Sequence, residues 1–131
     1  MVIKGRERHF LLTVKAANLI GELCPDNDFN NFTKITEGKT FAEIVEMDLK
    51  IAEILINEYE QNQAIENAGY VPDLVKLDDL KDSSEITPFW IRNLETELVT
   101  TIKRDAFGQI ETEESKEAKK AKKNASEAKA S

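Results

Sequence analysis

The side chains best suited to catalysis are a single histidine and a single cysteine, His9 and Cys24. A general base or metal ligand at His9 needs partner groups, and no Cys, His or carboxylate cluster of suitable spacing surrounds it. A nucleophilic cysteine needs an adjacent base, whereas Cys24 has the acidic neighbours Glu22 and Asp26, which raise the pKa of a thiol. We therefore expect His9 to face solvent or pack on a hairpin, and Cys24 to be buried at a helix end.

A short acidic stretch resembles the start of a calcium loop. Counted from Asp26, the EF-hand pattern requires a glycine at the sixth position and a glutamate at the twelfth. Glu37 satisfies the twelfth position, but Asn31 replaces the glycine and Phe29 interrupts the series of ligands. We interpret this stretch as a turn that connects helices.

Other chemical motifs are missing from the sequence. The five glycines are widely scattered, so no glycine-rich phosphate loop is present. The acidic pairs Asp78–Asp79 and Glu113–Glu114 are interpreted as solvated charges. The sequence thus predicts no catalytic residue, no cofactor and no metal site, and we expect a protein that is not an enzyme.

Charge is unevenly distributed along the chain. Residues 114–131 carry six Lys and three Glu, a charge of +3, while the preceding 113 residues carry 12 basic and 22 acidic groups, a charge of −10, which sums to the net −7. The acidic body disfavours nucleic acid, whose phosphates it repels. The cluster Lys119–Lys123 lacks the interleaved aromatics that stack on bases. A solvated tail is expected, and a small nucleic-acid-associated regulatory protein that uses this tail is the alternative function.

The 131 residues suffice for one domain. The composition is 40% hydrophobic and 33% charged, apolar enough for a core and more charged than the roughly 25% of typical globular chains. No run reaches the roughly 20 apolar residues of a membrane-spanning helix. The first residues, Met1 to Glu7, lack the apolar core of a secretory signal. We expect a soluble cytoplasmic protein.

The elements that position these residues are mainly helical. Apolar residues at 1–3 and 9–12 flank the turn-like sequence of residues 4–7, which predicts an N-terminal β-hairpin that must pack on a helix. Thr13 can cap a helix from about Val14 to Leu23, which Cys24-Pro25 ends. A short helical segment is expected at residues 29–35.

The strongest local signal begins at Thr40. Thr40 and Glu43 form a capping-box pattern, and no Pro or Gly follows Phe41 until Gly69, which predicts a helix from Phe41 to about Gln63, or as far as Asn67. At 100° per residue the flanking Met47 and Ile54 widen its apolar arc to roughly 220°. A helix of this kind either lies centrally in the domain or shares its surface with a partner. Its remaining apolar positions are Phe41, Ile44, Val45, Ile51, Ala52, Leu55, Ile56 and Tyr59.

An acidic linker follows, with one or two helical turns expected between Asp73 and Leu80. Thr87-Pro88 then predicts the start of a last helix, which runs to about Phe107 with Gly108 as its C-cap. Phe89 and Phe107 fall outside its apolar stripe and are expected to be exposed. The stripe itself comprises Trp90, Ile91, Leu94, Leu98, Val99, Ile102 and Ala106.

Two regions follow from these patterns. Residues 1–110 are predicted to form a mainly α domain of three to four helices with an N-terminal β-hairpin, and residues 111–131 a disordered or nascent-helical Ala/Lys/Glu-rich tail. Apolar surface that cannot all be covered inward marks interfaces. Met47, Ile54, Phe89 and Phe107 are therefore the candidate partner-binding residues, with burial in the core as the open alternative.

This order of elements resembles that of the tail assembly chaperones of long-tailed bacteriophages. The resemblance rests on Val2 to Glu7 followed by His9 to Leu12, on the helix around Ala16 to Leu23, on the long central helix, and on a last helix ending Ala106-Phe107-Gly108 before a charged tail. It covers residues 1–110 and includes no chemical motif.

The resemblance implies a function. Members of this family self-associate and coat the tape measure protein, keeping it soluble while the tail tube assembles, and they are commonly absent from the mature virion. It also implies contacts with other tail proteins, a location in the host cytoplasm and, in many members, a longer frameshifted form. An acidic chain with a wide apolar helix face suits weak, repeated binding to long helical segments.

Overall fold

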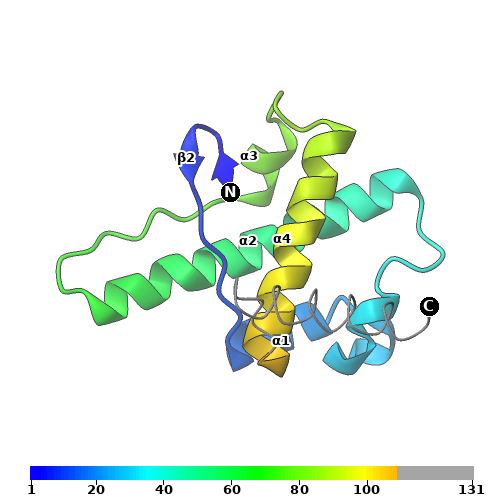
Figure 1. Ribbon diagram of the computed structural model, residues 1–131, viewed down its shortest axis with the longest axis horizontal. Coiled ribbons are helices and arrows are strands. Elements are labelled where there is room, and N and C mark those ends of the chain that lie inside the picture. The colour runs from blue at the N-terminus through cyan, green and yellow to red at the C-terminus, as the bar shows by residue number, and fades with distance from the viewer. Residues whose placement is uncertain (109–131) are drawn as a thin grey trace, which may run out of the picture.

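The computed structural model describes residues 1–108 and confirms the mainly helical fold with an N-terminal hairpin. In Figure 1 the long helix α2 runs along the longest axis of the molecule, and α4 crosses it steeply. The predicted tail, residues 111–131, lies outside the described residues. The elements are β1 (Val2–Ile3), β2 (Arg6–Glu7), α1 (Val14–Gly21), the 3₁₀ helices η1 (Pro25–Asn27) and η2 (Phe29–Lys34), α2 (Phe41–Glu66), α3 (Leu77–Lys81) and α4 (Pro88–Phe107).

The hairpin is shorter than expected, and its second strand was placed wrongly. β2 consists of Arg6–Glu7 and pairs antiparallel with Val2–Ile3, because the turn contains only Lys4 and Gly5, both with positive φ. The predicted second strand at residues 9–12 is instead an extended segment that crosses α2. There the Leu11 amide donates to the Leu55 carbonyl oxygen at 3.1 Å, and the alternating apolar side chains of this segment pack on helices.

The first helix and the 3₁₀ helix η2 form where the local signals predict them, whereas η1 was not predicted and lies in the turn-rich stretch. Thr13 caps α1 by accepting from the Ala16 amide at 3.2 Å, and the helix ends at Gly21. A side chain at Gly21 would meet the Phe29 backbone nitrogen at 3.3 Å, so glycine allows η2 to approach closely. Asp28, within the calcium-like stretch, caps η2 by accepting from the Asn30 amide. This stretch is a connection between helices, as predicted.

Helix α2 is the centre of the core. Its capping box is confirmed: the Glu43 amide donates to Thr40 Oγ1 at 3.3 Å, and the Thr40 amide donates to Glu43 Oε1 at 3.1 Å. Helices α1, α3 and α4 all pack against it. The helix also buries two carboxylates, on Asp48 and Glu60, that the apolar pattern did not include. Its buried apolar residues are Leu49, Ile51, Ala52, Leu55 and Ile56.

Helix α4 has the predicted bounds and caps. Thr87 Oγ1 accepts from the Trp90 amide at 3.1 Å, and Gly108 adopts the left-handed conformation of a C-cap. The buried stripe is narrower than predicted. Val99 and Ala106 are exposed, and Thr101 is buried in their place. The buried residues are Ile91, Leu94, Leu98, Thr101 and Ile102.

Candidate protein-binding surface

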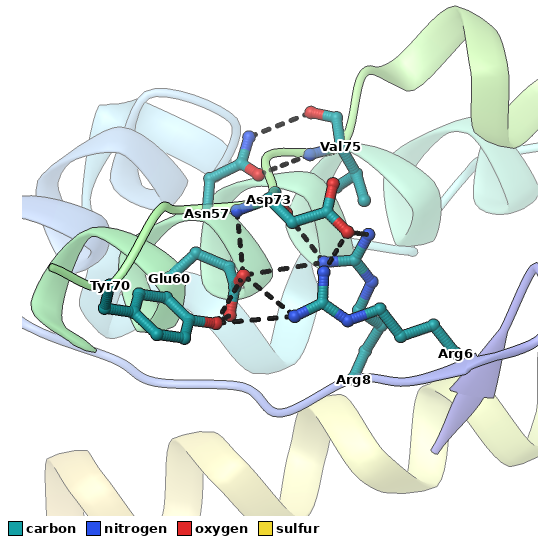
Figure 2. Close-up of polar contacts among 7 residues, drawn as sticks. All are labelled: Arg6, Arg8, Asn57, Glu60, Tyr70, Asp73 and Val75. Atoms are coloured by element: carbon teal, nitrogen blue, oxygen red, sulfur yellow. Dashed lines mark hydrogen bonds and ion pairs between the residues drawn. The ribbon is translucent and has the colours of Figure 1, made fainter. Parts of the chain in front are cut away.

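Two buried charges fix the hairpin and the acidic linker onto α2. Glu60 is 3% exposed and Arg8 is 8% exposed, so each needs partners to offset its lost hydration. The Glu60 carboxylate accepts from the Tyr70 hydroxyl at 2.8 Å and from the Asp73 amide at 2.9 Å. Arg6 approaches it at 3.4 Å and Arg8 at 3.9 Å (Figure 2).

The same network holds the linker in an extended conformation. Arg8 donates to the Asp73 carbonyl oxygen at 2.6 Å and to its carboxylate at 3.1 Å. Asn57 and Val75 exchange two hydrogen bonds, at 2.8 and 2.9 Å. As Figure 2 shows, the linker therefore lies alongside α2. This explains why helix α3 begins only at Leu77, four residues later than the earliest predicted start at Asp73. The network is structural and shapes the molecule around α2.

An apolar groove of about 380 Å³ opens between η2, α2 and α4. We call it the α2–α4 groove. Its apolar walls come from side chains on all three elements, and Phe107, which is 64% exposed, stands at its edge. Two carboxyl groups, on Asp48 and Glu95, line it as well. The complete lining is Phe32, Thr33, Ile35, Thr36, Asp48, Ile51, Glu95, Leu98, Val99, Ile102, Lys103 and Phe107.

The two carboxyl groups are electrostatically coupled. Asp48 is 5% exposed, and no hydrogen-bond donor of the described residues reaches its Oδ2 atom. Burial, together with the hydrogen bond to Glu95 and the charge of that residue, raises the pKa of Asp48 to about 8. Asp48 is therefore mostly protonated at neutral pH.

The four predicted contact residues do not form one site. Phe107 borders the α2–α4 groove, whereas Phe89, 72% exposed, lies at the opposite end of α4. The two residues are 18 positions apart, about 27 Å along the helix. Met47 lines a separate depression of about 200 Å³, and Ile54 packs partly buried against the core. The predicted exposure of Phe89 and Phe107 is confirmed, and the contact role of all four stays a prediction.

His9 and Cys24 occupy the positions expected from the sequence. His9 is exposed, and its ring packs on that of Tyr59 with centroids 5.0 Å apart. Cys24 is buried, and its thiol donates to the Ile20 carbonyl oxygen at 3.3 Å. Burial, and to a smaller extent Asp28, raises the pKa of this thiol. Within residues 1–108 no group of three or more His, Cys, Asp or Glu side chains is placed to hold a metal ion.

The sequence does contain a signal for the groove, at Asp48, which the prediction from apolar residues alone did not include. On a helical projection Asp48 falls in the middle of the apolar face of α2, where a carboxylate needs a partner or a proton. Arg8 and Glu60 gave no comparable signal, because a pairing across 52 residues depends on the tertiary fold.

Comparison with known proteins does not assign the chain to a family. No protein-family model matches it, and neither a curated protein nor a solved structure shows significant similarity to it. None of the helices in the described part of the chain is long and apolar enough to cross a membrane. The Lys119–Lys123 cluster, on which the nucleic-acid alternative depends, lies outside the described residues.

Proposed function

We propose that this protein is a tail assembly chaperone of a long-tailed bacteriophage, which binds helical segments of the tape measure protein and keeps them soluble during tail assembly. The observation that carries the proposal is the apolar α2–α4 groove with the exposed Phe107 at its edge. Apolar surface of this kind on a folded domain marks binding sites for other proteins. The order of elements, which resembles that of the family, supplies the identity of the partner.

Charge supports the same role. Residues 1–108 contain 12 basic and 20 acidic side chains, a charge of −8. An acidic chaperone that covers apolar segments keeps the resulting complex soluble through mutual repulsion. Self-association, other tail proteins as partners, action in the host cytoplasm and absence from the mature virion belong to the proposal through the resemblance.

Co-expression tests this function. The full chain is produced together with the tape measure protein of the same phage, and the soluble fraction of the tape measure protein is measured. We expect a soluble complex that co-purifies. A tape measure protein that stays insoluble and is not retained by the chain would contradict the proposal. A matched chain with Phe107→Ser serves as the control for the groove, because Phe107 is exposed and its loss leaves the core intact.

A further inference from the structure

The α2–α4 groove combines an apolar wall with a buried acidic pair, and this combination selects a ligand. Val99 and Ile102 on α4 and Ile51 on α2 present aliphatic surface. Asp48, 95% buried, contributes an oxygen atom without a donor from the described residues, next to the Glu95 carboxyl. A purely apolar ligand would leave this oxygen without a hydrogen bond, which is unfavourable for a buried polar atom.

We propose that the α2–α4 groove binds an amphipathic helix of a partner protein that carries one lysine or arginine within its apolar stripe, with the cation seated between Asp48 and Glu95. This inference rests on the proposed function only in taking the partner to be a helical protein segment. It adds the place where that segment binds and the side chain that the site recognises.

Charge complementarity decides the occupant. One cation placed against the acidic pair forms charge-assisted hydrogen bonds, which are stronger than neutral ones. A second copy of this domain carries the same charge of −8, so repulsion between the two like-charged copies disfavours it. Helices that lie in a groove place apolar anchors at i, i+3 or i+4, and i+7, and a long-stemmed lysine or arginine fits among such anchors.

Binding of the cation is linked to loss of the proton that Asp48 holds at neutral pH. A neighbouring positive charge favours the ionised carboxylates, so the proton leaves as the ammonium or guanidinium group enters. The charged groups that line the groove around Asp48 are Glu95 and Lys103, both on α4. From η2 and the turn after it, Thr33 and Thr36 contribute uncharged hydroxyls. The affinity for a cationic helix therefore rises with pH between 7 and 9.

Two synthetic peptides test this inference with the full chain. Each forms an amphipathic helix of about four turns with leucine anchors, and they differ at one central position of the stripe, which is lysine in one and norleucine in the other. The dissociation constants are measured by fluorescence anisotropy at pH 7 and pH 9. We expect the lysine peptide to bind about tenfold more tightly, as charge-assisted hydrogen bonds imply, and its advantage to grow at pH 9.

Three variants locate the effect. Asp48→Asn should reduce the advantage of the lysine peptide to about unity, and Phe107→Ser should weaken both peptides. Ile65→Ser, at an exposed position of α2 outside the groove, should leave both unchanged. Equal affinities of the two peptides, an advantage that survives Asp48→Asn, or no binding of either peptide would overturn the inference. These peptides contain no tail protein, so a negative result here leaves the co-expression result standing. Tight binding of the lysine peptide without solubilisation of the tape measure protein would refute the proposed function alone.

Discussion

The carboxyl groups of Asp48 on α2 and Glu95 on α4 lie together at the contact between the two longest helices, and both line the α2–α4 groove. Burial of Asp48 and its proximity to Glu95 give it a pKa of about 8. A buried acidic pair without a cation weakens the interface at high pH, when both groups are forced to ionise. The proximity of the Asp48 and Glu95 carboxyl groups therefore affects the stability of the fold as well as the binding of a ligand.

The first prediction concerns the pH dependence of stability. Because the pKa of Asp48 is higher in the folded than in the unfolded chain, the folded state binds more protons between pH 4 and 8. The contribution of Asp48 is fully present below pH 4 and is lost as the pH rises toward 8. We expect the stability of Asp48→Asn relative to the wild type, measured by urea unfolding, to increase by at least about 1 kcal/mol between pH 5 and pH 8.

The matched control for this experiment is Glu37→Gln, at an exposed carboxylate. It should leave the pH dependence of stability unchanged, because the Glu37 side chain is exposed to solvent. A wild type and an Asp48→Asn variant that lose stability in parallel from pH 5 to pH 8 would contradict the assignment.

The second prediction concerns the buried ion network. We expect Arg8→Met to lower the free energy of unfolding by about 3 kcal/mol, because it leaves the Glu60 charge buried with fewer partners. The control is Lys81→Met, which removes an exposed ion pair with Glu46 at 2.8 Å. Its effect on stability should be far smaller, because solvent screens that pair. Urea denaturation at pH 7 measures both. Equal losses in the two variants would refute a special role for the buried network.

The third prediction concerns the N-cap of α4. Replacing Thr87 by alanine removes the hydrogen bond that its hydroxyl accepts from the Trp90 amide, at a cost of about 1 kcal/mol. Thr100→Ala, at an exposed position inside the same helix, should be neutral or slightly stabilising, because alanine has the higher helix propensity. Thermal unfolding followed by circular dichroism separates the two. A stability loss at Thr100 equal to that at Thr87 would contradict the capping assignment.

The fourth prediction concerns Cys24. Its thiol is buried, and burial followed by the charge of Asp28 raises its pKa, so the reactive thiolate is scarce at neutral pH. We expect alkylation of the folded chain by iodoacetamide at pH 7.5 to be slow and to become fast in urea. Mass spectrometry of the alkylated chain gives both rates. A native rate close to that of the unfolded chain would show that Cys24 is accessible.

The sequence predicted the helices best where the signals were local. Thr40 with Glu43, and Thr87-Pro88 with Gly108, identify helix ends because each cap satisfies backbone groups within the same few residues. The second strand was misplaced because an apolar alternation, with Phe10 and Leu12 buried, is the same for a paired strand and for an extended segment that crosses a helix.

The candidate site was predicted less completely than the fold. The exposure of Phe107 follows from its position outside the stripe of α4, which is a local property. The groove itself depends on how η2, α2 and α4 meet, and the coupling of Asp48 with Glu95 joins residues 47 positions apart. Packing determines such pairings, and the periodicity of single helices contains no information about them.

The most direct test of the central claim, that the α2–α4 groove is the protein-binding site, is a chemical-shift map of the ¹⁵N-labelled full chain. A purified helical segment of the tape measure protein is titrated in, and the backbone amide signals are followed. We expect the largest changes at Ile35, Val99, Ile102 and Phe107, which line the groove, with little change in the hairpin at Val2 to Glu7. Changes centred on the hairpin, or none at a saturating concentration of the segment, would contradict this claim.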